Sequence, residues 1–554
     1  MIDLTKVPMS RFGSYFAISQ DAESGEVILR DLHGGDECPD KLFTLEIPGE
    51  NEKAKTAVRA EPTFLTLSAG EGKVEVCFGT PDTVNIYGTN TGLRLLTKEP
   101  TRYDTVLPLP DGGWEFISYK KDYKYRFDCV GGTILVKKQE DGISPVFEIT
   151  PSGNYFELAI TGYRVVCGHS PHTDYRQARQ ETDRSYACWL SSMNVLGGGE
   201  MAELAAYIAW SCVVGAESNL TRPAMYSSKN VMANAWSWDN CFCALAVAGS
   251  YPELALDQLL LFADHQDASG AYPDFVNDRF SSYSCVKPPV FGWTCEKLQS
   301  IHPFFKRREV VEQLYRTVER NTRFWMDYRK VDGLFFYTHG NDSGWDNASV
   351  FGKGVPLEAP DLTAHLIRQA DSLASMAEKL GDRKAAGEWH ERAQQWTGML
   401  LERLSDSDGF FARVQGEPLE CRSSLLLCLP VILGNRLPGA AIEKLLDSLE
   451  NRFLTPYGLA TEEVSSPYYR QDGYWLGPVW APVMYLVTDA LKQLGRLDLA
   501  KTYEQRFLSA IEKSGMSENF DPLTGCGNCD PAFAWTASVC LLYLRDISDW
   551  NEWI

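Results

Sequence analysis

The sequence has no long hydrophobic run and no excess of positive charge. Its longest apolar stretch, Leu425 to Leu433, is about half of the roughly 20 residues that a membrane helix needs, and Pro430 interrupts it. The chain carries 53 Lys and Arg against 74 Asp and Glu, a net charge of −21. A nucleic-acid binder needs a basic surface to neutralise phosphates, so this balance excludes that class of protein. We expect neither a nucleic acid nor a membrane as a partner.

Targeting and metal-binding motifs are also missing. The amino terminus, MIDLTKVPMSRFGSYFAISQ, lacks the positive segment and apolar run of a secretory signal. The 15 cysteines are odd in number and scattered, as is usual for reduced thiols of a cytosolic protein. Cys526 and Cys529 form one CxxC without a second pair nearby, and the eight histidines are dispersed. We therefore expect a cytoplasmic protein with no metal and no other cofactor.

The residues that are present divide the chain into two differently patterned halves. Up to about residue 190, short runs rich in Val, Ile, Tyr, Phe and Thr alternate with turn residues, which is typical of an antiparallel β-sandwich. From residue 199 onward about twelve amphipathic segments follow, most of them ending at Gly or Asn. One predicted helix covers residues 424–434 and another covers residues 474–495. We predict a multidomain chain with a β-sandwich at 1–190, a helix-bearing linker that Gly197, Gly198 and Gly199 close at about 200, and a ring of six helical hairpins at 200–554.

Four loop regions of the helical half have an unusual density of Trp, Asp, Tyr and Gly. They are NAWSWDNCF (234–242), HQDASGAYPDF (265–275) with KPPVFGW (287–293), NDSGWDNASVF (341–351), and DGYWLGPVW (472–480) with MSENFDPLTG (516–525) and FAW (533–535). Each acid also has an ordinary structural interpretation: Asp239 could cap the next helix, and Asp267, Asp274, Asp342 and Asp346 could form turns. A structural role is less obvious for Glu518, which follows a helix end where a carboxylate gains nothing from the helix dipole.

Acids flanked by aromatic residues favour a sugar-processing site. Aromatic residues make up 12% of the chain, and their faces can hold the C–H side of a sugar ring. In glycoside hydrolysis one carboxylic acid protonates the leaving oxygen while a second carboxylate activates water. The sequence has no GxxxxGK[ST] phosphate loop, no Rossmann GxGxxG after a strand, no HExxH and no GxSxG. Two-carboxylate chemistry is therefore the leading hypothesis.

Five motifs, in this order, resemble the signature loops of glycoside hydrolase family 63 and the related mannosylglycerate hydrolase-like enzymes. They are WSWDN (236–240), GWDNASVF (344–351), YWLGPVW (474–480), SENFDPLTG (517–525) and FAWTAS (533–538). The resemblance covers about residues 200 to 550. It implies a β-sandwich followed by an (α/α)6 barrel, and hydrolysis of α-linked glucose or mannose with inversion.

The resemblance also implies roles for individual residues. Asp346 falls on the general acid, Glu518 on the general base, and Asp239 on the acid that binds sugar hydroxyls. For inversion the carboxyl groups of Asp346 and Glu518 should lie roughly 6.5–9.5 Å apart, which leaves room for water. The remaining substrate-binding positions are Trp236, Trp238, Asn240, Asp274, Lys287, Trp345, Asn347, Tyr474, Trp475, Trp480 and Trp535.

Two positions depart from the family pattern. Leu476 stands where the family usually has Arg in Y-W-R-G-P, and Lys287 stands where it often has Gln before the Pro-Pro pair. These changes suggest an altered subsite and favour a neutral leaving group over an anionic one. We predict an inverting, exo-acting α-glycosidase that hydrolyses a short α-glucoside or glucosyl conjugate. The alternatives are a glycoside phosphorylase, another (α/α)6 glycosidase such as an α-L-rhamnosidase, and a non-catalytic carbohydrate-binding protein.

Overall fold

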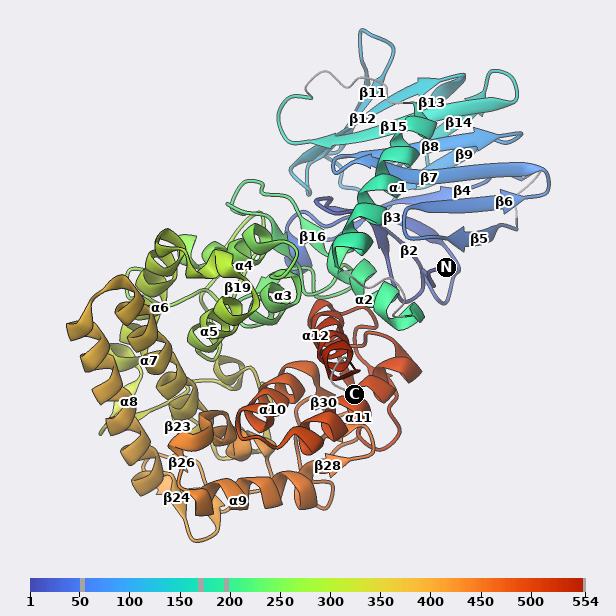
Figure 1. Cartoon of the computed structure of the whole chain (residues 1–554). Coiled ribbons are helices and arrows are strands. Elements are labelled where there is room, and N and C mark those ends of the chain that lie inside the picture. Colours follow the sequence, from blue (N-terminus) through green and yellow to red (C-terminus); the bar gives the residue numbers. More distant parts are fainter. Residues whose placement is uncertain (50–54, 168–173, 194–198, 552–554) are drawn as a thin grey trace. The chain divides into compact units, whose positions relative to one another are not determined.

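A computed structural model describes residues 1–49, 55–167, 174–193 and 199–551 of the chain. The residues form two compact units, each with its own core (Figure 1). The first unit holds Met1–Leu196 and two later segments, Ala206–Asn234 and Asn277–Phe280. Gly197 and Gly198 of the predicted linker lie outside the described residues. We keep the domain boundary at about residue 200 as a proposal.

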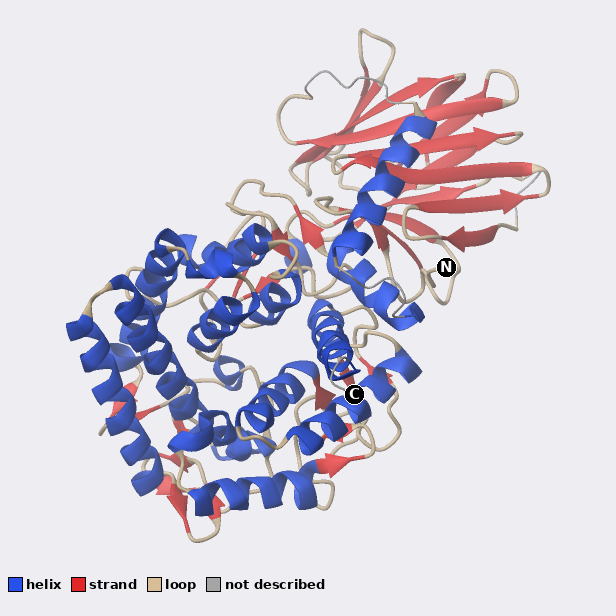
Figure 2. Cartoon of the chain, in the orientation of Figure 1, coloured by secondary structure: helices blue, strands red, loops and turns tan. Residues whose placement is uncertain are grey.

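The first unit is built around two antiparallel sheets, drawn as red arrows in Figure 2. The seven-stranded sheet has the order β1 (Met9–Ser10), β2 (Phe16–Gln20), β3 (Val27–Asp31), β4 (Lys41–Glu46), β9 (Leu93–Thr97), β14 (Pro145–Pro151) and β13 (Gly132–Lys138). The eight-stranded sheet has the order β10 (Thr105–Pro108), β11 (Trp114–Ser118), β12 (Tyr123–Val130), β15 (Tyr155–Tyr163), β8 (Thr83–Thr89), β7 (Gly72–Thr80), β6 (Phe64–Ala69) and β5 (Ala57–Ala60).

Alternation along the strands explains why these segments form a sandwich. On β12 the side chains of Tyr123, Tyr125 and Phe127 are buried, whereas the intervening Lys124 and Arg126 are partly exposed. Successive side chains of a strand point to opposite faces, so one face of this strand is apolar and turns inward. The buried faces of the two sheets form a single hydrophobic core.

The polar segment before residue 200 forms a helix, as the sequence predicts. Helix α1 (Tyr175–Ser192) begins after Asp174, whose side chain accepts hydrogen bonds from the first backbone N–H groups of the helix. It lies across β7 and β8 (Figure 1), where Tyr175 and Ala178 pack against Cys77. This segment is therefore part of the first unit.

The second unit is made of helices arranged in a ring (Figure 1). Its helices are α3 (Asp239–Val247), α4 (Pro252–Asp264), α5 (Phe291–Ile301), α6 (Arg308–Tyr328), α7 (Pro360–Leu380), α8 (Arg383–Arg403), the 3-10 helix η5 (Leu425–Arg436), α9 (Gly439–Ser448), the π-helical turn η6 (Leu449–Phe453), α10 (Ala481–Gln493), α11 (Leu497–Ser514) and α12 (Ala534–Asn551). Helix α2 (Gly199–Ser211) begins in this unit and ends in the first.

Consecutive helices pack as hairpins, and α12 packs beside α3 to close the ring. Nearly all residues of α3, η5 and α10 are buried, which identifies them as inner helices. Outer helices bury one face only: α6 buries Val311, Leu314 and Val318, while its exposed face carries the ion pair of Arg316 with Glu312. This alternation of buried and half-buried helices agrees with the predicted ring of hairpins.

Short strands and single helical turns fix the loops between the helices. The strands are β16 (Val213–Val214), β17 (Ala224–Met225), β18 (Ala235–Trp236), β19 (Phe275–Val276), β20 (Ser281–Ser282), β21 (Lys330–Val331), β22 (Leu334–Phe335), β23 (Leu357–Glu358), β24 (Ser405–Asp406), β25 (Gly409–Phe410), β26 (Arg413–Val414), β27 (Glu417–Pro418), β28 (Leu454–Thr455), β29 (Gly458–Leu459), β30 (Val479–Trp480), β31 (Asn519–Phe520) and β32 (Gly527–Asn528). The helical turns between the helices are η2 (Pro303–Lys306), η3 (Gly340–Ser343) and η4 (Ser349–Lys353), whereas η1 (Gly35–Glu37) lies between β3 and β4 of the first unit.

Two predicted helices differ from the structure. The segment at 424–434 forms the 3-10 helix η5, which contains Pro430 and is broken at Gly434. The helix predicted from Tyr474 begins at Ala481, because Gly477 and Pro478 interrupt the pattern and Val479 and Trp480 form β30. The residues from Tyr474 to Pro478 therefore form a loop in front of β30 and α10.

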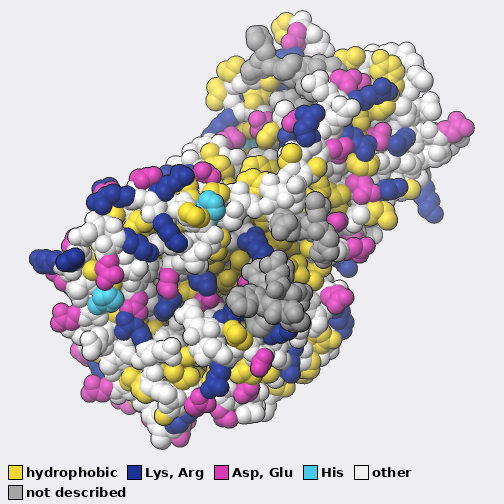
Figure 3. Space-filling view, in the orientation of Figure 1, with side chains coloured by type: hydrophobic (Ala, Val, Ile, Leu, Met, Phe, Trp, Pro, Cys, Tyr) yellow, Lys and Arg dark blue, Asp and Glu magenta, His cyan; other side chains and the backbone are white. Residues whose placement is uncertain are grey.

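The surface of the helical unit carries charges of both signs. Lys and Arg side chains are interspersed with Asp and Glu on the face seen in Figure 3. Among the residues that the structure describes, no helix has the length and apolarity that a membrane span requires.

Candidate active site

The predicted loops lie at the amino-terminal ends of alternate helices of the ring. Residues 234–242 lead into α3 and residues 265–293 into α5, while residues 341–351 precede α7. Residues 472–480 lead into α10, and residues 516–535 lead into α12. Because helices pack as antiparallel hairpins, the amino-terminal ends of alternate helices meet at one rim of a ring. The chain order therefore collects the candidate residues at one rim.

The first two loops are joined by the sheet β18–β19–β20. Trp236 pairs with Phe275 in this sheet, and the backbone N–H of Ser237 donates to the carbonyl of Asp274 at 3.0 Å. Asp239 is the first residue of α3 and is only 4% exposed. Its capping interpretation is wrong, because Trp238 occupies the N-cap position.

Asn240 lies in the first turn of α3, next to Asp239. Its side-chain amide donates to Gln258 Oε1 on α4 at 3.1 Å, and Asn240 is fully buried. The observed contact joins two helices of one hairpin, and we keep substrate binding by Asn240 as a proposal.

Lys287 and Asp274 form a buried ion pair. Lys287 Nζ lies 3.1 Å from Asp274 Oδ1, donates to the carbonyl of Asn341 at 3.1 Å, and lies 5.4 Å from the ring centre of Trp236. Both side chains of the pair are 7% exposed. Lys287 therefore brings a cation between the second loop and the third.

The charges around this pair influence its protonation. Burial is the largest influence on Asp274 and raises its pKa, although Lys287 opposes this. Burial also disfavours the charged form of Lys287, but the carboxylates of Asp274, Asp346 and Asp239 outweigh it and raise the pKa of Lys287. The predicted acid, Asp346, and the predicted sugar-binding residue, Asp239, therefore lie within electrostatic reach of one buried ammonium group.

Asp342 organises the third loop from the interior. It is fully buried and accepts hydrogen bonds from the backbone N–H groups of Val286 (3.0 Å), Thr338 (2.8 Å) and His339 (3.1 Å). Arg329 completes its shell at 3.0 Å. The side chain of His339 caps η3 by accepting from Asn341 N. Asp342 therefore supports the loop, whereas Asp346 is partly exposed.

Two glycines let this loop approach its neighbours. A Cβ at Gly340 would lie 1.8 Å from the carbonyl oxygen of Asp346. Gly344 has a φ of +70°, and its Cβ would lie 2.7 Å from the ring of Trp238. Only glycine fits such positions without displacing backbone or ring. The position of Asp346 therefore depends on both.

Asn347 ties the third loop to the fourth. Its Nδ2 donates to the carbonyl of Gly473 at 3.0 Å, and its Oδ1 accepts from Trp475 N at 2.9 Å. Asn347 is exposed, and we keep its predicted contact with substrate as a proposal. The observed bonds bring Asp346, the preceding residue, beside the Tyr474 loop.

Glu518 is a buried carboxyl with an altered acidity. It is 5% exposed, its Oε1 accepts from Tyr474 OH at 3.0 Å, and its Oε2 accepts from Asp530 N at 3.4 Å. Burial raises the pKa of Glu518 to about 7, although the bond from Tyr474 opposes the shift. The strands β30, β31 and β32 pair beside it and fix this part of the chain.

Tyr474 is hydrogen-bonded to Glu518 and also lies within the electrostatic influence of Asp346. Burial is the main reason that the pKa of Tyr474 is raised, and the negative charges of Glu518 and Asp346 raise it further. The tyrosine has a φ of +63°, a conformation that few non-glycine residues adopt. The two predicted catalytic carboxyls therefore both act on one buried hydroxyl group.

Five of the predicted tryptophans form one packed cluster. Trp475 and Trp480 stack with ring centres 4.0 Å apart, Trp345 lies 4.8 Å from Trp475, and Trp535 lies 5.4 Å from Trp480 and 5.7 Å from Trp238. Each of the five is at most 4% exposed. We infer that they form the floor of the site. Trp480, with no exposed surface, offers no face to a ligand.

Two indole N–H groups of this cluster donate hydrogen bonds to the backbone of the loops that carry Tyr474 and Glu518. Trp480 Nε1 donates to the carbonyl of Tyr474 at 3.0 Å, and Trp535 Nε1 donates to the carbonyl of Glu518 at 3.1 Å. Trp236 lies apart from the cluster, against Phe275 at 4.6 Å. Two of the tryptophans thus hold the backbone of Tyr474 and of Glu518, the predicted base, as well as filling space.

Sequence reasoning missed two buried acids near the third loop. Glu462 is fully buried and accepts a hydrogen bond from Ser349 Oγ at 2.6 Å. Asp361, in the first turn of α7, accepts from Tyr337 OH at 2.8 Å, and burial raises the pKa of Asp361 to about 7. The sequence signal for Asp361 was an acidic residue at the start of an apolar helix. Such a residue usually only stabilises the first turn of the helix, so the signal does not indicate a functional site.

Metal ligands do not cluster in the described part of the chain. No group of three or more His, Cys, Asp or Glu side chains there could hold a metal ion. Cys526 and Cys529, the single CxxC, are exposed free thiols.

Comparison with known proteins identifies the family. A model of the mannosylglycerate hydrolase MGH1-like glycoside hydrolase domain matches residues 232–536, which is more than half of the chain. The chain belongs to this family. Residues 232–536 contain every predicted site residue from Trp236 to Trp535. The resemblance seen in the loop motifs is therefore confirmed.

Named relatives of the chain are mannosylglycerate hydrolases. That of Thermus thermophilus is 30% identical over 160 residues, covering 28% of this chain and 38% of the relative. Mannosylglycerate hydrolase MGH2 of Selaginella moellendorffii is 35% identical over 88 residues, 16% of this chain and 18% of the relative. That of Rubrobacter radiotolerans is 27% identical and covers 55% of this chain and 89% of the relative. The chain thus spans about two fifths or less of the first two relatives.

Solved structures with this architecture confirm the predicted fold class. The family 63 mannosylglycerate hydrolase from Thermus thermophilus, solved in complex with Tris, covers 62% of this chain and 100% of its own, with 21% identity and a TM-score of 0.55. A bacterial glucoamylase complexed with acarbose covers 99% and 94%, with 12% identity and a TM-score of 0.63. The chain is a β-sandwich followed by an (α/α)6 barrel.

Proposed function

We propose that this protein is an inverting, exo-acting α-glycosidase that hydrolyses a short α-glucoside or glucosyl conjugate in the cytoplasm. The observation that carries the proposal is the pairing of Glu518 with Tyr474, a hydroxyl that also lies within the electrostatic influence of Asp346. Membership of a glycoside hydrolase family supports the reaction class.

Glu518 is proposed as the general base. A base is most effective when its pKa is close to the working pH, since it is then both available and strongly proton-accepting. Burial gives Glu518 a pKa of about 7, and the hydroxyl of Tyr474 orients one of its carboxylate oxygens. Its other oxygen would take the proton from the attacking water.

Asp346 is proposed as the general acid. It protonates the glycosidic oxygen while the bond from that oxygen to the anomeric carbon breaks, and water adds to the opposite face of the sugar with loss of a proton to Glu518. Asp346 is partly exposed and held by a loop with two required glycines, so it can meet a leaving group at the pocket entrance. The product has the inverted anomeric configuration.

The sugar hydroxyls would be bound by Asp239, Asp274 and Lys287. Lys287 is ion-paired with Asp274 and donates one hydrogen bond to the Asn341 carbonyl, so its ammonium group has a further proton available for a sugar hydroxyl. The apolar side chain of Leu476, in place of the usual arginine, supports a neutral leaving group. Because the curated relatives are mannosylglycerate hydrolases, α-mannosides belong in the substrate panel beside α-glucosides.

The test measures hydrolysis of a panel of α-glucosides and α-mannosides with neutral and anionic leaving groups, by NMR detection of the released anomer. Asp346→Asn and Glu518→Gln should each lower kcat by a factor of about 10³ or more, because each removes a proton-transfer group. Asp498→Asn, at an exposed position in the first turn of α11, is the matched control and should retain activity.

Retained turnover in both active-site variants would exclude the assignment. Initial release of the unchanged anomer would show retention, and cleavage that requires phosphate would show a phosphorylase.

A further inference from the structure

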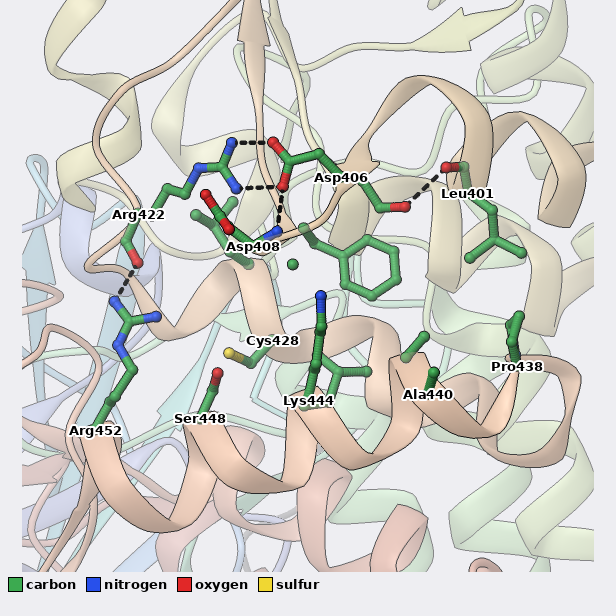
Figure 4. Close-up of a pocket in the computed structure, with 16 residues that line it drawn as sticks. Leu401, Asp406, Asp408, Arg422, Cys428, Pro438, Ala440, Lys444, Ser448 and Arg452 are labelled. Carbon is green, nitrogen blue, oxygen red and sulfur yellow. Dashed lines mark hydrogen bonds and ion pairs between the residues drawn. The ribbon is translucent and has the colours of Figure 1, made fainter.

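A second cavity lies away from the candidate active site, in the wall of the helical unit (Figure 4). Its volume is about 270 Å³, close to the lower bound of about 300 Å³ for small-molecule pockets. It is enclosed by the end of α8, the hairpin of β24 and β25, the start of η5, α9 and η6. None of the residues proposed for catalysis or substrate binding lines it.

One side of the cavity is apolar and includes an aromatic ring. Phe410 of the β24–β25 hairpin lines the cavity together with Ala441 and Leu445 of α9 and Leu427 of η5. Cys428 is also at this side, and burial raises the pKa of its thiol to about 12. The thiol is therefore protonated, and this side presents an uncharged face.

The same hairpin and helix also bring charges of both signs to the cavity. Arg422 is joined to Asp406 by both of its terminal nitrogens, and Arg452 donates to the carbonyl of Arg422 at 2.8 Å (Figure 4). Lys444 reaches from α9 toward the hairpin, where it donates to the carbonyl of Ser407. Asp408 lies beside Asp406 on the hairpin, and its backbone N–H donates to Asp406 at 2.8 Å.

This lining disfavours two kinds of occupant. A phosphate or another small anion would meet two carboxylates, and Arg422 and Arg452 are already paired with Asp406 and with Glu463. A purely apolar molecule would cover the charged groups of Lys444 and Asp408 and remove water from them without offering either group a hydrogen bond, which costs free energy. A sugar ring has an apolar C–H face and a rim of hydroxyl groups, so it can contact the apolar lining residues and hydrogen-bond to the charged ones at once.

We propose that this cavity is a second carbohydrate-binding site, which takes one or two sugar rings. The C–H face packs against Phe410 and Leu445, Asp408 accepts from hydroxyl groups, and Lys444 donates to them. This proposal does not depend on the proposed catalytic function, since no residue is shared between the two sites.

The test uses the full-length chain with methyl-labelled alanine and titrates it with D-glucose and with D-mannose. The methyl groups of Ala440 and Ala441 line the cavity, whereas that of Ala348 lies next to Asn347 in the candidate active site. Saturable shifts of the Ala440 and Ala441 signals with at least one of the sugars are expected. The proposal would be overturned if the Ala440 and Ala441 signals did not shift at all. The titration ends at saturation of the Ala348 signal or, where Ala348 does not respond, at about 100-fold molar excess of sugar over protein.

Variants distinguish cavity binding from indirect effects. Ala441→Phe fills the cavity, and Asp408→Asn removes an acceptor charge at an exposed position where folding is not at stake. Each should weaken the response of Ala440 at least tenfold, while the control Asp498→Asn should leave it unchanged. An unaltered titration of Ala440 in both variants would refute the site. Failure of the proposed catalytic function would instead appear as absent turnover with the Ala440 response intact.

Discussion

Replacing Tyr474 with Phe tests how the acidity of Glu518 is set. The change deletes the hydrogen bond from Tyr474 OH to Glu518 Oε1, which is 3.0 Å long and stabilises the ionised carboxylate. Hydrogen bonds to charged groups contribute about 1.5–3 kcal/mol, and one pKa unit corresponds to about 1.4 kcal/mol. We expect the pKa of Glu518 to rise by about one unit, from about 7.

The sign of the effect on activity follows from the role of the base. Only ionised Glu518 accepts a proton, so kcat/KM falls as the pH drops through the pKa of this residue. At pH 6 the ionised fraction is about one tenth in the wild type and about one hundredth in Tyr474→Phe, so kcat/KM should differ about tenfold from this cause alone. At pH 9 most of the carboxyl is ionised in both, and the ratio should shrink to whatever loss of substrate binding the variant causes.

The assay is the pH profile of kcat/KM for the best substrate of the panel. Tyr469→Phe is the matched control, because Tyr469 lies in the same loop and its hydroxyl has no hydrogen-bond partner among the described residues. Its acid limb should coincide with that of the wild type. A Tyr474→Phe profile that is lower at all pH values but has an unshifted acid limb would refute the reasoning about Glu518.

Three further changes test the electrostatics and the packing of the site. Glu518→Gln should be more stable than the wild type by up to about 3 kcal/mol at pH 8, but not at pH 4. The reason is that the pKa of Glu518 is raised from 4.5 to about 7 in the folded chain, so the wild type loses stability as the pH rises through this range. Urea unfolding at both pH values measures the difference. Lys287→Met should destabilise the chain by about 3 kcal/mol in urea unfolding, because Asp274 is left buried without its cation, and the double variant with Asp274→Asn should recover most of the loss. Gly340→Ala should lower kcat roughly a hundredfold, because the new Cβ displaces the carbonyl of Asp346, while Gly352→Ala in the same loop, where a Cβ meets open space, should leave kcat unchanged.

The architecture was predictable because its signals are local and periodic. Alternating burial along β12 and the apolar stripe of α6 are properties of consecutive residues, so the sequence displays them directly. Errors occurred where turn residues compete with apolar content. The segment before Ala481 has an apolar helical pattern, but Gly477 and Pro478 give it a loop and a strand instead.

The pairings inside the site were harder to predict, because they join residues that are distant in sequence. Lys287 could be recognised as a departure from the family, but its bond to the carbonyl of Asn341 depends on how two loops meet. The bond between Ser349 and Glu462 spans 113 positions, and neither residue stands out in the sequence. Local patterns contain no information on such contacts.

The tryptophans show why a motif reveals a site without revealing each residue's role. The sequence suggested that six of them line a sugar pocket, whereas five are buried against one another, and two of these donate hydrogen bonds to the backbone of Tyr474 and Glu518. An indole that fixes the backbone of the proposed general base, as Trp535 does for Glu518, would be as necessary for the site as a residue that touches sugar, since small displacements of a base reduce proton transfer steeply. A motif therefore includes both kinds of residue, and only their exposure in the folded chain separates the support from the surface that meets the ligand.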